Sequence, residues 1–297
     1  MARTPRPLAG HVVAITGAAR GIGRATAQAC VHAGMRVAIG DLDLAAAQRT
    51  ASELGNETIA VELDVCDRAS VARFLDEAEA RLGPLDVLVN NAGIMQLGRL
   101  VEEDDATARR QVDINVHGVL HGMKEALPRM LARNAGHVVN IASTLGKAGL
   151  PGSATYSGTK HFVVGVSEAA RFELRGSGVE ISCVMPGIVK TELATGLPQA
   201  RFVKHAEPGE VASAIVEVLR APRFDVFVPR SIGVLIRAAN LLPRPAREAM
   251  ARALKADRVL DLPDGRVRRA YELRAARSSA GLPAGDEPPQ LPAPPEP

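Results

Sequence analysis

The chain has 297 residues, of which 46% are hydrophobic, and its net charge is +3. This length fits one large α/β domain or two small ones, and the apolar content is sufficient for a sizeable core. The small net charge, the 3% of aromatic residues and the lack of tryptophan argue against a nucleic-acid-binding surface that stacks bases.

The cysteines and the first residues of the chain indicate the cellular compartment. Cys30, Cys66 and Cys183 are far apart and form no metal-binding or disulfide pattern, which indicates a reducing, cytoplasmic setting. The first ten residues lack the apolar core of a secretory signal, so we expect none. No run of about 18 apolar residues is present, so we expect no membrane span.

Short β-branched runs alternate with Ala-rich stretches that are long enough for helices. Both faces of these runs are apolar, as in parallel strands covered by helices on both sides. The pattern predicts an α/β fold: a doubly wound parallel sheet, or Rossmann fold, of seven strands within residues 11–230. The expected strands cover residues 11–16, 36–40, 58–63, 86–90, 137–142, 179–185 and 224–228.

Outside this region we expect a flexible lead-in over residues 1–10, a basic helical extension over 231–277 and a disordered, Pro-rich tail over 278–297. Residues 230–277 contain twelve Lys and Arg but five Asp and Glu. A mostly apolar helix is predicted over 231–242; Pro243 and Pro245 end it, and a second helix restarts over 246–254.

The glycine-rich string after the first strand predicts a phosphate-binding loop. It reads TGAARGIG and contains Gly17, Gly21 and Gly23, with Arg20 and Ile22 between them. Glycines let the backbone approach a ligand closely, and the helix that follows offers free N–H groups to a pyrophosphate. A tight turn that only packs the helix on the strand is the alternative, but the position after the first strand favours a dinucleotide.

Acidic residues at the ends of the second and third strands refine the cofactor prediction. Asp41 follows Gly17 by 24 positions and can bind the adenine ribose, so NAD is favoured over NADP. Arg20 keeps NADP possible, because a basic side chain can receive a 2′-phosphate. Asp43 is expected to cap a helix. Asp64, beside Val65, is expected either to bind the adenine amino group or to cap a helix.

Five motifs in order resemble the short-chain dehydrogenase/reductase family over residues 10–230. They are TGAARGIG, the NNAG string at 90–93, Ser143 thirteen residues before Tyr156, the YSGTK string that contains Tyr156 and Lys160, and PGIVKT from Pro186. The resemblance implies that Ser143, Tyr156, Lys160 and Asn115 are catalytic. It further implies that Lys160 binds the nicotinamide ribose and that the cofactor also contacts Val65, Asn91, Ala92, Gly93, Tyr156, Pro186, Gly187, Val189 and Thr191.

The chemistry of a phenol beside an ammonium supports this assignment. A free tyrosine has a pKa of about 10, so about 0.1% is phenolate at neutral pH. Lys160 follows Tyr156 at i+4 on one helix face, and its charge is expected to lower the pKa of the phenol by about 2–3 units. Tyr156 would then act as general base or acid, while Ser143 holds the substrate oxygen and Asn115 orders a water that relays protons from Lys160.

The expected activity is hydride transfer between NAD(H) and a secondary alcohol or ketone. An NADP(H)-dependent carbonyl reductase and a nucleotide-binding relative without turnover are the alternatives. Loops over 94–100, 144–152 and 192–205 are apolar and favour a lipophilic substrate that resembles a steroid, a retinoid or a fatty acyl group. Lys147, Arg201, Lys204 and His205 could instead receive an anionic group.

The sequence also suggests the oligomeric state, a membrane contact and the absence of a metal. The resemblance implies a homodimer or homotetramer, with contacts through helices around 104–132 and 154–175. Residues 231–277 could dock peripherally on an anionic membrane. We favour the alternative, in which they pack over the substrate cleft or against another subunit. No metal is expected: His117, His121 and His161 lack carboxylate or cysteine partners at ligand spacing. Arg109 and Arg110 are expected to form a solvated or subunit-facing patch.

Overall fold

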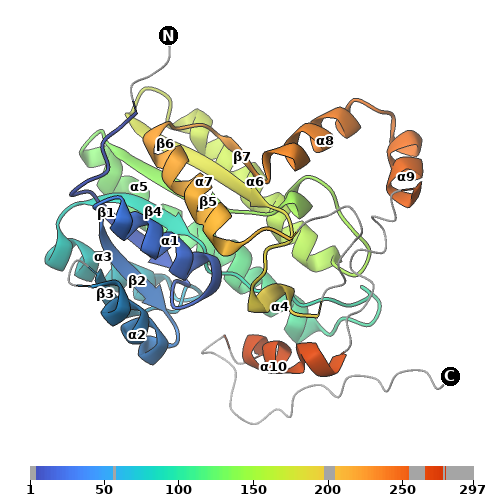
Figure 1. Cartoon of the computed structure of the whole chain (residues 1–297), viewed down its shortest axis with the longest axis horizontal. Helices are drawn as coiled ribbons and strands as arrows, with labels where there is room; N and C mark the ends of the chain where they lie inside the picture. Colours follow the sequence, from blue (N-terminus) through green and yellow to red (C-terminus); the bar gives the residue numbers. More distant parts are fainter. Residues whose placement is uncertain (1–4, 56–57, 197–204, 254–264, 277, 279–297) are drawn as a thin grey trace.

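The computed structural model describes residues 5–55, 58–196, 205–253, 265–276 and 278 (Figure 1). The predicted tail from 279 onward, and Arg201 and Lys204, therefore lie outside the described residues. Of the lead-in, residues 5–10 lie against the body: the backbone N–H of Arg6 donates to the carbonyl of Arg220 and Leu8 is buried.

Seven parallel strands form one sheet in the order β3-β2-β1-β4-β5-β6-β7. The predicted fold class and all seven predicted strands are confirmed. The strands are β1 (Val12–Thr16), β2 (Arg36–Asp41), β3 (Thr58–Glu62), β4 (Leu85–Asn90), β5 (Gly136–Ile141), β6 (Val179–Pro186) and β7 (Asp225–Val228).

Helices cover both faces of the sheet (Figure 1). One layer contains α1 (Gly21–His32), α2 (Leu44–Leu54) and α7 (Pro208–Arg220). The other contains α3 (Arg68–Leu82), α5 (Gly118–Ala132) and α6 (Ala154–Glu173). α4 (Asp105–Val112) runs into α5 through a π-helical turn, η1 (Asp113–His117), and two short 3-10 turns, η2 (Thr144–Gly146) and η3 (Glu192–Ala194), follow β5 and β6.

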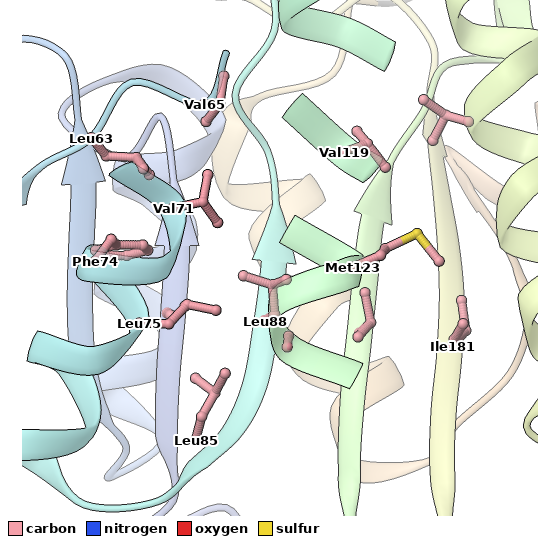
Figure 2. Close-up of a cluster of buried hydrophobic side chains, with 14 of the residues drawn as sticks. Leu63, Val65, Val71, Phe74, Leu75, Leu85, Leu88, Val119, Met123 and Ile181 are labelled. Carbon is pink, nitrogen blue, oxygen red and sulfur yellow. The ribbon is translucent and has the colours of Figure 1, made fainter. Parts of the chain in front are cut away.

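The alternation of side chains along each strand divides the core in two. In β1, Val12 and Ala14 join the cluster under α3, α5 and α6, whereas Val13 and Ile15 join the cluster under α1, α2 and α7. Figure 2 shows part of the first cluster, in which Phe74 lies among leucines and valines from α3 and the strands. Burial on both faces is why these strands read as continuous apolar runs.

The order of the strands reverses between β1 and β4, which pair with each other in the middle of the sheet. Loops after these two strands leave in opposite directions, so a crevice opens at their carboxyl ends. The glycine-rich string follows β1 and the NNAG string follows β4, so the topology brings the two motifs together.

Three helices follow the sheet: α8 (Arg230–Asn240), α9 (Arg244–Ala253) and α10 (Gly265–Ala276). Pro243 separates α8 from α9 as predicted. Pro245 does not break a helix, because it lies in the first turn of α9, where proline is tolerated. Figure 1 shows α8 and α9 beyond β7 at the outside of the molecule, whereas α10 lies against the body. The sequence did not predict α10. None of the helices described is long and apolar enough to cross a membrane.

Candidate active site

The glycine loop is built so tightly that side chains would not fit. Gly17 has a φ of +64°, and a Cβ there would lie 2.8 Å from the Cα of Ala92. A Cβ on Gly23 would lie 2.4 Å from the carbonyl oxygen of Gly17 and 2.6 Å from Nδ2 of Asn91. The loop therefore packs directly on the segment that follows β4, and the backbone at the N-terminus of α1 remains free of bulky side chains.

Hydrogen bonds hold these two segments together. The side-chain amide of Asn91 donates to the carbonyls of Thr16 and Gly17, at 2.9 Å each. The hydroxyl of Thr16 accepts from the backbone N–H groups of Asn91 and Ala92, at 3.0 Å each. Thr16 is buried and was not predicted as a site residue. Its position directly before Gly17 was the signal that could have identified it.

The predicted ribose-binding acid lies beside the glycine loop. One oxygen of Asp41 accepts from the backbone N–H of Ala19 at 3.0 Å, and the other accepts from that of Asp43 at 3.1 Å. Asp43 caps α2, as expected, by accepting from Ala46. Arg20 is paired with acids: it binds Asp43 at 2.5 Å and lies 3.9 Å from Glu192.

Asp64 and Val65 take local roles at the end of β3. The carboxylate of Asp64 accepts from the backbone N–H of Cys66 at 2.8 Å, while Asp67 caps α3. Val65 is buried, and its carbonyl is bound by Nδ1 of His121 at 2.9 Å. Asp67, not Asp64, caps the helix, so the helix-cap interpretation of Asp64 is wrong, and its contact with the adenine amino group stays a prediction.

Ser143, Tyr156 and Lys160 converge beyond the carboxyl ends of β5 and β6. Ser143 lies two residues after β5, and its hydroxyl accepts from the N–H of Leu145 at 3.1 Å and donates to the carbonyl of Pro186 at 3.5 Å. Tyr156 and Lys160 lie in the first turns of α6, and both are buried. The Nζ atom of Lys160 lies 5.7 Å from the centroid of the Tyr156 ring and donates to the carbonyl of Ile141 at 3.0 Å.

The predicted fall in the pKa of Tyr156 is wrong for the protein alone. Burial raises the pKa of this phenol to about 12, although a hydrogen bond with Ser143 acts in the opposite direction. Burial also lowers the pKa of Lys160 to about 8. The ammonium is directed at the carbonyl of Ile141, so its field does not offset the loss of hydration around the phenol.

Asn115 lies in η1, and its side chain is fully buried. The carboxamide oxygen accepts from the N–H of Ile94 at 2.9 Å, and the amide nitrogen donates to the carbonyl of Ile94 at 2.9 Å and to the hydroxyl of Thr159 at 3.1 Å. Asn115 thus ties the segment after β4 to α6. A Cβ on Gly93 would lie 3.1 Å from Oδ1 of Asn115 and 3.6 Å from Nζ of Lys160, so Gly93 lies within this group.

The PGIVKT segment forms one side of the crevice. Pro186 ends β6, the N–H of Gly187 donates to Val228, and Val189 is buried and bridges to Ala206. Thr191 lies next to Gly21, whose added Cβ would be 3.5 Å from the threonine methyl group. A cavity of about 520 Å³ opens here between the glycine loop and the start of η3, and Ile22 packs beneath it in the core. Its lining includes Arg20, Lys190 and His205.

The surroundings of Tyr156 are apolar. Its ring packs with Met95 in a small cluster that also contains Leu97, Leu145, Leu150, Ile188, Leu193 and Ala194. All but Ile188, which lies in the PGIVKT segment, come from the loops that the sequence assigned to the substrate walls. Lys147, offered as an anion receptor, instead lies 3.8 Å from Asp225.

Sequence reasoning missed the side chains of α10 and misplaced one arginine. Arg268 and Tyr271 of α10 are buried against the segments that contain Met95 and Leu193. The second of the chain's two tyrosines, three residues after an arginine, was the available signal. Arg109 is exposed as expected, but Arg110 is buried beside Gln96.

The three histidines have ordinary partners. Their Nδ1 atoms lie within hydrogen-bond distance of an acceptor on the same or a neighbouring element. For His117 this acceptor is the carboxylate of Asp113, four residues earlier, so the expectation that His117 has no carboxylate partner is wrong. The pairs are His117 with Asp113, His121 with the Val65 carbonyl and His161 with the Ser157 carbonyl.

The fold and this crevice define a Rossmann-type protein with a dinucleotide cradle and a serine, a tyrosine and a lysine beside it. The family profile described as short chain dehydrogenase matches residues 11–201. The chain belongs to the short-chain dehydrogenase family, a family of oxidoreductases, as predicted.

Individual relatives agree with this assignment. A sorbitol dehydrogenase of Cereibacter sphaeroides is 39% identical over 199 residues, which cover 67% of this chain and 77% of that protein. A cis-4-hydroxycyclohexanecarboxylate dehydrogenase of Sinomonas cyclohexanicum is 39% identical over 220 residues, covering 69% and 87%. One much longer relative is matched over only 18% of its own length.

A solved structure shows the same arrangement. A short-chain dehydrogenase/reductase from Burkholderia phymatum in complex with NAD has a TM-score of 0.72 and 30% identity, and the match covers 78% of this chain and 93% of that one. Its bound NAD agrees with the predicted cofactor.

Proposed function

We propose that the protein is an NAD(H)-dependent dehydrogenase that interconverts a secondary alcohol and a ketone, with Tyr156 as general acid and base. The observation that carries this proposal is the convergence of Ser143, Tyr156 and Lys160 beside an apolar cluster at the carboxyl end of the sheet, next to the 91–93 segment on which the glycine loop packs. A pocket of this kind positions a reacting carbon, an acid or base and a cofactor together.

The crevice fits a dinucleotide. The cavity of about 520 Å³ is lined by Gly21, the first residue of α1, and by Thr191, so a pyrophosphate could approach the free N–H groups at the N-terminus of that helix. The cofactor would be held by the glycine loop, Asp41, the 91–93 segment, Lys160 and the segment from Pro186 to Thr191. When bound, NAD supplies the hydride acceptor or donor.

The side chains of the chain handle the proton. At neutral pH the phenol of Tyr156 is protonated, so it can donate its proton to a ketone oxygen during reduction and recover it during oxidation. The bond that the Ser143 hydroxyl donates to the Pro186 carbonyl is long, at 3.5 Å, so its O–H can turn to the substrate oxygen and stabilise charge there. An ammonium has three N–H groups. Among the described residues, the ammonium of Lys160 donates only to the carbonyl of Ile141, which leaves two N–H groups for a cofactor or substrate.

The placement of Asp41 and Arg20 supports NAD over NADP. The carboxylate of Asp41 lies at the loop where an adenine ribose would bind, and it would repel a 2′-phosphate. Arg20, the basic group that could attract one, is neutralised by Asp43. An NADP(H)-dependent reductase remains the alternative, and Asp41→Ala tests it.

We propose a lipophilic secondary alcohol as the substrate, because six apolar side chains surround Tyr156 and Met95. The Sinomonas relative is named for an alicyclic hydroxy acid, which agrees with this, whereas the Cereibacter relative is named for a polyol. The choice among steroid-, retinoid- and acyl-like compounds requires a substrate screen read at the nicotinamide absorbance band.

Tyr156→Phe tests the mechanism. Loss of the hydroxyl should lower kcat by about 10²–10⁴-fold, because a positioned acid or base contributes about that much. NADH affinity, measured by the fluorescence of the bound dinucleotide, should change little. Unchanged turnover in this variant would reject the proposed role of Tyr156, and NADH binding without turnover in the wild type would favour the nucleotide-binding alternative.

The oligomer and the domain boundaries also remain proposals. Exposed apolar side chains on the helices expected to form the contact support a homodimer or homotetramer: Val112, Leu131, Phe162 and Phe172. Light scattering of the wild type and of Phe172→Asp tests it, and a monomer in both would reject it. Residues 11–230 are proposed as the dehydrogenase domain and 231–277 as its extension.

Peripheral membrane contact is proposed for the outer face of α8. Val234 on this helix is 67% exposed, and Leu241, directly after it, is 88% exposed. Arg230 and Arg237 lie on the same helix and pair with Glu217 and Asp225. Apolar side chains flanked by arginine suit an anionic lipid surface. In flotation with phosphatidylserine vesicles, Val234→Asp should reduce binding; equal recovery of the protein from anionic and neutral vesicles would reject the proposal.

A further inference from the structure

The C-terminal helix α10 presents one face to the body of the protein. Arg268, Tyr271 and Ala275 are buried, and they follow one another at the spacing of a helix face. Arg269 and Arg274, on other faces, are exposed. The helix therefore lies flat against the molecule, and its contacts show where.

Polar contacts from α10 reach the backbone of two separate segments. The hydroxyl of Tyr271 accepts from the N–H of Met95 at 2.8 Å, and the guanidinium of Arg268 donates to the Met95 carbonyl. The same guanidinium donates to the carbonyls of Leu193 at 3.0 Å and Thr195 at 3.3 Å. One arginine thus joins the segment after β4 to the segment after β6.

Further contacts of α10 reinforce this connection. Glu272 pairs with Arg268 at 2.6 Å and accepts from the side-chain amide of Gln96 at 3.2 Å. Arg274 binds Glu192 at 3.0 Å. The guanidinium of Arg268 also stacks over the Tyr271 ring at 4.8 Å. Because the Arg268 side chain is only 4% exposed, its bonds are made away from water, where an unpaired donor or acceptor is costly.

The segments that α10 joins contribute to the apolar cluster around Tyr156, where the proposed substrate would bind. Met95 and Leu193 belong to the apolar cluster around its ring, so α10 holds both backbones while their side chains face the tyrosine. Tyr156 itself is only 6% exposed. With α10 in place, the walls cannot separate unless several buried hydrogen bonds break together.

We propose that α10 is the roof of the substrate pocket and restricts it to compact lipophilic alcohols, with Arg268 as the positioning residue that fixes the walls. The substrate class rests on the proposed function, whereas the roof rests on the contacts of α10. A bulky alcohol is disfavoured because it would need Met95 and Leu193 to move apart.

The two tyrosines and the lack of tryptophan give a direct measurement of the roof. Tyr271→Phe gives up the bond to the Met95 N–H but keeps the bonds from Arg268 to the carbonyls of Met95, Leu193 and Thr195. In this background the only tyrosine is Tyr156, so acrylamide quenching of tyrosine fluorescence reports access to the active site. Arg268→Ala in this background should raise the quenching constant. Arg269→Ala, on the exposed face of the same helix, is the matched control and should not. An equal quenching constant in all three proteins would overturn the roof.

Substrate size gives the second measurement. With NAD, the ratio of kcat/KM for 4-phenylcyclohexanol to that for cyclohexanol should rise at least about tenfold in Arg268→Ala, as expected when a pocket wall is released. Arg268→Lys keeps the positive charge and the aliphatic part of the side chain but loses the planar guanidinium that binds several carbonyls. This variant should have near-native thermal stability and an intermediate ratio of the two kcat/KM values.

The outcomes separate the two proposals. Quenching that rises while the ratio stays at its wild-type value would overturn the restriction by size. Quenching requires no turnover. If the wild type oxidises no alcohol, that result counts against the proposed function, and the proposal for α10 is then decided by the fluorescence measurement alone.

Discussion

The ionisation of Tyr156 is the quantity on which the proposed chemistry depends. Burial raises its pKa to about 12, so about 1% of the phenol should be ionised at pH 10, where a free tyrosine is half ionised. The rise of about two units corresponds to about 3 kcal/mol against the phenolate. Oxidation of an alcohol near pH 8 requires this penalty to be reversed.

Lys160 alone can at most offset this rise. A unit charge at about 6 Å in an effective dielectric of 20 contributes about 3 kcal/mol, or about two pKa units. Even this amount would bring the phenol back only to its ordinary value of about 10. The remaining shift must accompany binding of the oxidised cofactor, so we expect the pKa of Tyr156 to be high in the free enzyme and lower in the complex.

Absorbance at 295 nm measures the phenolate directly. In Tyr271→Phe, Tyr156 is the only tyrosine, and its titration should have a midpoint near 12 without cofactor. Saturating NAD⁺, with a matched cofactor blank, should lower the midpoint by at least about two units, and Lys160→Met should remove most of this change. A midpoint at or below 10 in the free enzyme, or one that NAD⁺ does not move, would refute this reasoning.

Three further outcomes follow from the structure. Asp41→Ala should reduce the preference for NADH over NADPH by at least about tenfold in dissociation constants; an unchanged preference would reassign selectivity to other residues. Gly23→Ala places a Cβ 2.4 Å from a backbone oxygen and should cost about 1–3 kcal/mol and weaken NADH binding, whereas Gly165→Ala, with open space around it, should do neither. Burial lowers the pKa of His137, bonded to Ser182, to about 3. The unfolded chain therefore binds the proton first, and stability should fall as pH drops from about 6.5 toward 3, at most by about 5 kcal/mol. His137→Gln should flatten this dependence in urea titrations at pH 4.5 and 7.5, and an equal loss in both proteins would assign the acid sensitivity elsewhere.

The sequence by itself determined the sheet and the cradle. Strands buried on both faces read as apolar runs whatever their neighbours are, and a glycine-rich string between a strand and a helix is recognised from its own residues. The spacing of Tyr156 and Lys160 also fixed their shared helix face, because i and i+4 neighbour each other in every α-helix. These features depend on local geometry, so the order of residues is enough to predict them.

Only the tertiary structure decided which segments cover Tyr156 and what the pKa of its phenol is. The pKa of Tyr156 depends on how much water the surrounding loops exclude and on which carbonyl Lys160 binds, and neither quantity is encoded in a spacing. The position of α10 depends on Arg268 and Tyr271 meeting the backbone of Met95, more than 170 positions earlier in the chain. Backbone groups are the same at every residue, so a helix that recognises them leaves no complementary pattern in the sequence of its partner.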